Sequence, residues 1–388
     1  MNYVFLSPHF PSNYKNFAIA LKKEGVKVLG LGSEPYDNLE DTLKEALTEY
    51  YRVDNMEDYD QLVKACGYFT FKYGKIDRIE SHNEYWLETD AKLRTDFNVE
   101  GFKIGDMPSI KMKSKMKEVF IRAGVPVAKG IIVTSIDVAE TFIKEVGYPV
   151  CAKPDNGVGA SNTYKISNPG ELLYFFRTKP DMDYFMEEFI TGEIHTFDGL
   201  VNKEGEVVFK NSFVFGKGVM ETVNDGLDQF YHNQRTIPKD LEVYGLSAVK
   251  EFGLKERFFH IEFFRTKEGS LIALEVNVRP PGGLSLDMFN YASDIDVYNT
   301  YARLVSGKEI DTLVDIKYHC GYVGIKDNNS YALVNSKEEV REKFRDLIIN
   351  SGPIASIFSA ALGNYSYILR SEDLEKIKEA SKFILTRS

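Results

Sequence analysis

Three polar side chains alternate with valines in the stretch ALEVNVRPPGG, residues 273–283. Glu275, Asn277 and Arg279 occupy every second position, and side chains two residues apart on a strand lie on the same face. An acid, an amide and a guanidinium therefore share one face, and the valines share the other. We interpret the polar face as one that meets a charged ligand; a solvated sheet surface is the alternative.

A hairpin is expected to bring a second acid to the same place. The polar segment TKEGS separates two apolar strand patterns, which is typical of a β-hairpin. With the turn centred on Glu268–Gly269, Glu262 lies directly opposite Glu275, and two facing carboxylates repel each other unless a cation lies between them. Glutamate and asparagine oxygens suit Mg²⁺ or Mn²⁺, with phosphates completing the coordination. The sequence therefore predicts a metal site formed by Glu262, Glu275 and Asn277.

A lysine followed by small residues forms a second candidate, in VCAKPDNGVGASN. Lys153 ends an apolar strand, and Gly157, Gly159 and Ser161 follow it. Small residues let backbone N–H groups approach phosphate oxygens, while a lysine supplies positive charge. The lysine precedes the glycines, so the pattern is not a P-loop. A surface lysine before a flexible turn is the alternative.

A basic amphipathic helix is expected over residues 112–123, and it carries Lys113 and Lys117. Residues four apart lie on one helix face. The pair indicates either a phosphate-binding face or, more commonly, a solvated one.

Acids cluster around an apolar residue in MEEFITGE, where Glu187, Glu188 and Glu193 bracket Ile190. Acids can accept hydrogen bonds from an adenine amino group or from ribose hydroxyls, and an isoleucine can pack on a base. A charged edge strand explains the segment equally well.

Candidate substrate residues lie elsewhere. Glu84 is expected to open a helix, where its acid either reaches a cleft or favours the helix N-terminus. His232 and Arg235 are expected in a polar loop that either binds a substrate carboxylate or is an ordinary loop. Gly282, in the turn after Arg279, would let the backbone pass close to a substrate.

The elements that must position these residues begin with alternating strand and helix patterns over the first hundred residues, which indicate a parallel α/β sheet. The first strand is not followed by G-x-G-x-x-G, so nothing favours dinucleotide binding. A third region, from about residue 311, is expected to contain strands near 318–325 and 365–370 and two helices.

Bulk properties exclude several classes of protein. The 388 residues suggest two or three domains, and the net charge of -10 argues against a broad nucleic-acid or anionic-membrane surface. The three cysteines are far apart and odd in number, which favours a reduced, cytoplasmic protein over a disulfide framework. The N-terminus does not resemble a signal peptide, and no apolar run is long enough to span a membrane.

Taken in order, these motifs resemble the ATP-grasp superfamily over roughly residues 1–310. The glycine loop departs from the family's common Gly-Ser-x-Gly form, so its phosphate contacts are the least defined part of the resemblance. The residues that the resemblance assigns to ATP are Lys113, Lys153, Gly157, Gly159, Ser161, Glu187 with the backbone of Glu188 and Ile190, and the ribose acid Glu193. It assigns Glu262, Glu275 and Asn277 to metal, and Arg279, together with Lys153, to catalysis at the transferred phosphate or acyl-phosphate.

The resemblance implies an α/β and α+β protein with an ATP-grasp fold. Its parts would be an N-terminal Rossmann-like domain, an ATP-grasp domain with a lid, and a small C-terminal α+β domain; the expected ranges are 1–105, 106–310 with the lid at roughly 115–188, and 311–388. The implied cofactors are ATP with Mg²⁺ or Mn²⁺.

The implied activity resembles that of L-amino acid ligases and biotin carboxylase-type enzymes. It is carbon–nitrogen ligation of a small-molecule carboxylate to an amine through an acyl-phosphate, releasing ADP and phosphate. A bicarbonate-activating enzyme and a catalytically silent ATP-binding regulatory protein are the alternatives. Neither a nucleic-acid nor a membrane partner is expected, and a homodimer is a further expectation.

Overall fold

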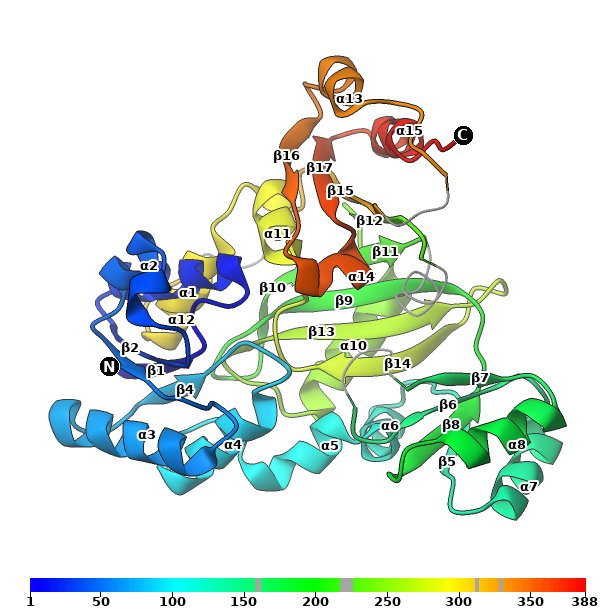
Figure 1. Ribbon diagram of the computed structural model, residues 1–388, viewed down its shortest axis with the longest axis horizontal. Coiled ribbons are helices and arrows are strands. Elements are labelled where there is room, and N and C mark those ends of the chain that lie inside the picture. The colour runs from blue at the N-terminus through cyan, green and yellow to red at the C-terminus, as the bar shows by residue number, and fades with distance from the viewer. Residues whose placement is uncertain (158–161, 217–225, 311–313, 328–330) are drawn as a thin grey trace.

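The computed structural model describes residues 1–388 apart from 158–161, 217–225, 311–313 and 328–330, and its strands form three sheets (Figure 1). The first is parallel, in the order β3-β2-β1-β4, as the alternating pattern predicts. Its strands are β1 (Asn2–Leu6), β2 (Lys27–Gly32), β3 (Glu49–Arg52) and β4 (Arg78–Glu80).

Helices cover both faces of this sheet, and its two central strands are buried along almost their whole length. Tyr3 and Phe5 of β1 join a core with α1 and α12, whereas Val4 and Leu6 join a second core with α3 and α4. These helices are α1 (Lys15–Lys23), α3 (Tyr59–Tyr73), α4 (Leu87–Asp96) and α12 (Val297–Val305); the short α2 (Asp41–Ala46) lies beside α1.

The second sheet is antiparallel, in the order β5-β8-β6-β7, with α7 and α8 packed against it (Figure 1). Its elements are β5 (Gly130–Ile132), α7 (Ile136–Val146), β6 (Val150–Pro154), β7 (Tyr164–Ile166), α8 (Pro169–Thr178) and β8 (Tyr184–Glu188). It falls within the expected lid. By contrast α6 (Lys113–Arg122), which overlaps the start of that range, packs on α10 (Lys239–Glu251) and β14 (Leu271–Asn277).

The third sheet runs in the order β14-β13-β9-β11-β12-β15-β17-β16, and β10 pairs with β9. The expected C-terminal strands exist, but they extend this sheet instead of forming their own, because β15 pairs with β12. The division into domains therefore stays a prediction. The remaining strands are β9 (Glu193–Val201), β10 (Val207–Asn211), β11 (Phe213–Phe215), β12 (Gln229–Asn233), β13 (Arg257–Arg265), β15 (His319–Ile325), β16 (Ile348–Pro353) and β17 (Tyr365–Ser371).

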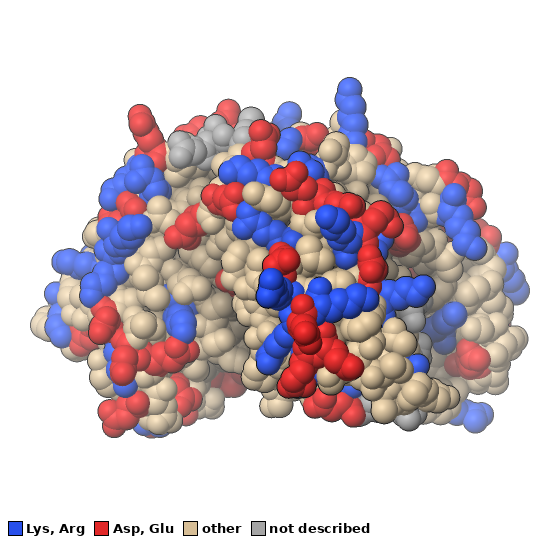
Figure 2. Space-filling view, turned by 90° about the horizontal axis from the view of Figure 1, so that it is seen from above, with Lys and Arg blue, Asp and Glu red and all other residues tan. Residues whose placement is uncertain are grey.

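Further helices pack around the third sheet and its ends (Figure 1). They are α5 (Met107–Lys111), α11 (Ser285–Ser293), α13 (Lys337–Lys343), α14 (Ser359–Leu362) and α15 (Leu374–Ile384). None of the helices in the described part of the chain is both long and apolar enough to cross a membrane. Figure 2 shows acidic and basic side chains interspersed over one face of the molecule.

Candidate active site

A cavity of about 490 Å³ is lined by residues of the second and third sheets and of the loop after β4. It collects most of the residues that the sequence singles out. Those lining it are Glu84, Lys113, Lys117, Lys153, Glu187, Glu188, Ile190, Glu262, Glu275, Asn277, Arg279 and Gly282.

The β13–β14 hairpin places Glu262 directly opposite Glu275, as predicted. The turn itself is centred on Glu268 and not between Glu268 and Gly269, since the Thr266 amide donates to the Ser270 carbonyl at 2.9 Å. The register shifts by one residue next to Glu262, because β14 contains a bulge. The bulge restores the opposition of the two acids and turns Glu275 and Asn277 into the cavity, while Val276 packs in the core.

An imidazole links Glu262 to a buried aspartate. His260 Nδ1 lies 2.6 Å from Asp198 Oδ1, and its Nε2 lies 2.9 Å from Glu262 Oε1. Burial alone would lower the pKa of His260, but Asp198 and Glu262 raise it to about 10. His260 is therefore a buried imidazolium that fixes the orientation of the Glu262 carboxylate.

The environment of the Glu275 carboxylate is the one expected where a cation binds. Burial, and then the facing Glu262, raise the pKa of Glu275, while Lys113 lowers it less. Across the described residues no three acidic, histidine or cysteine side chains gather as a metal site, so an ion here would rely on two carboxylates and the Asn277 amide oxygen. These hard oxygen donors and their mutual repulsion fit Mg²⁺.

A second buried charge group joins the second sheet to α6. Glu187 Oε1 lies 2.5 Å from Lys153 Nζ, and its Oε2 lies 2.6 Å from Lys117 Nζ. Burial opposes ionisation of Glu187, but the two lysines lower its pKa to about 2. In this structure the Glu187 carboxylate thus forms ion pairs with two lysines. The sequence resemblance assigned Glu187 to adenine binding and did not predict these ion pairs.

Lys113 is tied to the loop that follows Lys153. Its Nζ donates to the Gly157 carbonyl at 3.2 Å, and Ser114 donates its N–H and its hydroxyl to the two Asp155 oxygens, both at 2.7 Å. The start of α6 is therefore joined to the residues that follow β6, and Lys113 and Lys153 line one cavity. The other two loop residues assigned to phosphate, Gly159 and Ser161, lie outside the described residues.

Arg279 and Glu84 form an ion pair in the cavity wall. Arg279 Nη2 and Nε donate to Glu84 Oε2 at 2.6 and 3.1 Å. Burial raises the pKa of Glu84, but Arg279 and Lys111 lower it more, so the carboxyl is ionised. Glu84 does not open a helix as expected: α4 begins at Leu87, and Glu84 lies in the turn before it.

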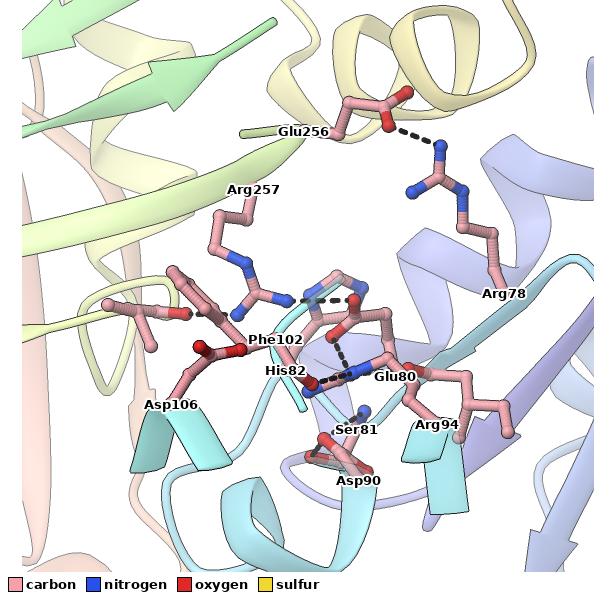
Figure 3. Close-up of polar contacts among 12 residues, drawn as sticks. Arg78, Glu80, Ser81, His82, Asp90, Arg94, Phe102, Asp106, Glu256 and Arg257 are labelled. Atoms are coloured by element: carbon pink, nitrogen blue, oxygen red, sulfur yellow. Dashed lines mark hydrogen bonds and ion pairs between the residues drawn. The ribbon is translucent and has the colours of Figure 1, made fainter. Parts of the chain in front are cut away.

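A buried ionic network, drawn in Figure 3, involves residues next to the two segments that carry this pair. Arg257 donates to Glu80 Oε1 at 2.9 Å and to the Val278 carbonyl at 3.0 Å, and Arg94 lies 3.2 Å from Glu80 Oε2. Val278 immediately precedes Arg279, and Glu80 ends the strand that leads to Glu84. The network thus ties together the two chain segments that carry the ion pair.

His82 lies in the same network and makes stability depend on pH. It is buried against Phe17, with ring centroids 4.1 Å apart, and burial lowers the pKa of His82 to about 4. A histidine whose pKa is lower in the folded state stabilises the fold above pH 6.5, and this contribution is lost as pH falls through the folded value. We expect the His82 contribution to be about 2 kcal/mol smaller at pH 5 than at pH 7.

The measurement is the free energy of unfolding by urea at both pH values for the wild type and for His82→Asn. Asp90, whose pKa is raised to about 7 by burial, titrates in the opposite sense, so the difference between the two proteins isolates His82. Parallel pH profiles would contradict the assignment.

Among the described residues, four predicted site residues do not line the cavity, and one of them is Gly157, whose carbonyl accepts from Lys113. Glu193 begins β9 with its side chain 67% exposed, beside two residues that do line it. His232 lies within β12 and not in a loop; Tyr231 faces the cavity, so strand alternation turns His232 away. Arg235 is exposed and donates to the Glu372 carbonyl at 3.2 Å.

Two parts of the site have no counterpart in the sequence prediction. One is His260, for which the spacing His260-x-Glu262 on a single strand face was the available signal. The other is the cavity wall formed by Phe358, Ala361 and Leu362 of the C-terminal region, for which the sequence carries no local signal.

No protein-family model matches the chain, but individual proteins are similar to it in sequence and in structure. The chain is 26% identical over 243 residues to the L-arginine-specific L-amino acid ligase of Bacillus subtilis, and the alignment covers 60% of this chain and 58% of the relative. The match thus spans little more than half of that ligase's length.

Two solved structures are similar over nearly the whole chain. The L-amino acid ligase from Bacillus licheniformis has a TM-score of 0.76 at 16% identity, with 99% of this chain and 96% of that chain covered. The biotin carboxylase domain of the Hydrogenobacter thermophilus 2-oxoglutarate carboxylase, in complex with MgADP, ADP and bicarbonate, has a TM-score of 0.72 at 16% identity, with 100% and 90% covered. The chain therefore has the ATP-grasp fold that its motifs predict.

Proposed function

We propose that the protein is an ATP-dependent carboxylate–amine ligase that forms an amide through an acyl-phosphate. The observation that carries the proposal is the convergence of the Glu262–Glu275 pair, the Lys113 and Lys153 amines and Arg279 on one cavity. Similarity to amino acid ligases in both sequence and fold supports it.

In this mechanism a carboxylate oxygen of the substrate attacks the γ-phosphorus of ATP, and the bond from that phosphorus to the β-phosphate bridging oxygen breaks to release ADP. An amine nitrogen then attacks the acyl carbon, the carbon–oxygen bond to phosphate breaks, and the amine loses a proton. Lys113 and Lys153 offset the charge of the phosphates, and Arg279 orients the transferred group. Catalysis of this kind rests on positioning and charge neutralisation, not on a side-chain nucleophile.

Glu262, Glu275 and Asn277 would hold Mg²⁺. Mn²⁺ could replace it, because both ions prefer oxygen ligands. A divalent ion bound there would neutralise phosphate charge that the lysines leave uncompensated. The Ile190 segment and the backbone of Glu188 would receive the adenine. The expected homodimer and cytoplasmic location stay predictions.

Bicarbonate activation is the second candidate, favoured by the similarity to the carboxylase domain solved with MgADP and bicarbonate. Bicarbonate has no side chain and would leave the apolar part of the cavity without a role. An ATP-binding regulatory protein would have no need of the opposed acids.

The products of ATP distinguish these possibilities. We expect ADP and phosphate to be released only when a carboxylate and an amine are present together, and we expect AMP not to accumulate. Nucleotide products separated by ion-exchange chromatography after incubation with mixed amino acids and Mg²⁺ provide the measurement. AMP and pyrophosphate as products would rule out the acyl-phosphate route, and ADP release that needs bicarbonate alone would favour the second candidate.

A further inference from the structure

Four polar side chains lie side by side on strands β9 and β13, next to the cavity. The register sets His260 opposite Asp198 and Glu262 opposite Thr196. Residues that face each other across an antiparallel pair lie on the same face of the sheet. His260 and Glu262 line the cavity, whereas Asp198 and Thr196 are fully buried. The group therefore runs from the interior of the protein to the cavity.

Hydrogen bonds fix this group at its buried end. The Phe213 backbone N–H donates to Thr196 Oγ1 at 2.9 Å, and the Thr196 hydroxyl donates to Asp198 Oδ2 at 2.5 Å. His260 Nδ1 donates to Asp198 Oδ1 at 2.6 Å. Both oxygens of the buried carboxylate are thus engaged, and the imidazole cannot turn without leaving Asp198 Oδ1 unpaired.

The fixed imidazole occupies one oxygen of Glu262. His260 Nε2 donates to Glu262 Oε1 at 2.9 Å. Among the described residues, Glu262 Oε2 has no hydrogen-bonding partner. A cation that also approached Oε1 would compete with the ring N–H for that oxygen. Glu262 therefore offers a cation its Oε2 atom, and the hydrogen bond from His260 opposes the use of both oxygens.

Magnesium and calcium differ in what they require of such a carboxylate. Mg²⁺ demands octahedral geometry with oxygens at about 2.0–2.1 Å, and a single oxygen from a glutamate suits it. Ca²⁺ takes about six to eight oxygens at about 2.3–2.6 Å and accepts both oxygens of one glutamate. A glutamate that is held to one free oxygen thus disfavours the larger ion.

We propose that His260 makes this site discriminate against Ca²⁺ in favour of Mg²⁺, because it restricts Glu262 to a single metal-binding oxygen. Asp198 and Thr196 act through His260 as positioning residues. The selectivity rests on the metal site of the proposed function and adds a determinant of ion choice to it. Removal of an outer partner of a metal ligand changes metal affinity by about 10–100-fold.

The test measures Mn²⁺ binding to the nucleotide-free protein by electron paramagnetic resonance, with Mg²⁺ or Ca²⁺ as the competitor. In His260→Leu we expect the ratio of the Mg²⁺ and Ca²⁺ dissociation constants to shift toward Ca²⁺ by about tenfold relative to the wild type. The matched control is His319→Leu, which should keep the wild-type ratio. His319 lies on β15 of the same sheet, outside the cavity lining, and its Nδ1 donates to the Asn233 carbonyl at 3.2 Å.

A second variant covers the case in which His260→Leu does not fold, since that change leaves Asp198 buried without its partner. Asp198→Asn keeps the shape of the side chain and weakens its hold on His260 Nδ1. It should shift the ratio in the same direction by a smaller factor. Circular dichroism melts identify the variants that are folded.

The nucleotide-free assay separates ion selectivity from the ligase function. A shift toward Ca²⁺ in a protein that releases no ADP with any carboxylate and amine would support the selectivity and contradict the ligase. The role of His260 would be overturned by an unchanged ratio in the folded variants or by an equal shift in His319→Leu. Mn²⁺ binding that Glu262→Gln leaves unchanged would also overturn it.

Discussion

Replacing Glu275 by glutamine is expected to lower amine-dependent ADP release by about 10²–10³-fold, the scale on which removal of one preorganised electrostatic group reduces turnover. Glu275 is one of two opposed carboxylates, and the amide that replaces it keeps the shape but loses the charge that would hold a divalent cation. Steady-state assays beside a circular dichroism melt provide the measurement, with magnesium titrated to high concentration to reveal weakened binding.

The matched control is Glu268→Gln, which changes an exposed glutamate in the turn of the same hairpin. It removes the same charge from the same hairpin without touching the cavity, so activity should stay near that of the wild type. Full activity in Glu275→Gln would remove Glu275 from the metal site. A lowered melting temperature in that variant alone would attribute its loss of activity to misfolding.

Replacing Glu80 by alanine is expected to destabilise the protein by about 3–5 kcal/mol, because it leaves two buried guanidiniums without their shared acid. Arg94 is fully buried and Arg257 nearly so, and both contact Glu80. The loss should also reduce turnover, since Arg257 bonds the carbonyl that precedes Arg279. Urea unfolding followed by fluorescence measures the first effect.

A surface ion pair provides the contrast for this prediction. Lys129 and Glu145 are both 61% exposed at 2.9 Å, and Glu145→Ala should cost less than about 1 kcal/mol. If Glu80→Ala were as mild as this control, the network would not hold the two segments together. Partial recovery in Arg94→Met combined with Glu80→Ala would confirm that the uncompensated charge is the cause.

The sequence predicts those features that depend on short spacing. The alternation around Glu275 and the apolar partner strand predict a hairpin with two acids face to face, and the helix period places Lys113 and Lys117 on one side. Even here the agreement has two causes, since the turn is centred on Glu268 and not between Glu268 and Gly269, and the bulge in β14 compensates for that difference.

Features that depend on distant contacts are those that the sequence does not predict. Glu187 meets Lys117 only because the second sheet packs near α6, and His260 acquires its role from Asp198 on a neighbouring strand. The strand β12 was expected to be a loop around His232, because polar residues there resemble turn composition. Pairing with β15, far along the chain, overrides that local preference.

The pairing of β12 with β15 also has a consequence for how the chain is made. During synthesis β12 emerges well before β15, so one row of its N–H and C=O groups has no partner until residues 319–325 leave the ribosome. An exposed strand edge of this kind can pair with another chain. We therefore expect a protein truncated before residue 319 to aggregate through pairing of its exposed β12 edge with other chains, and not to form a smaller folded enzyme.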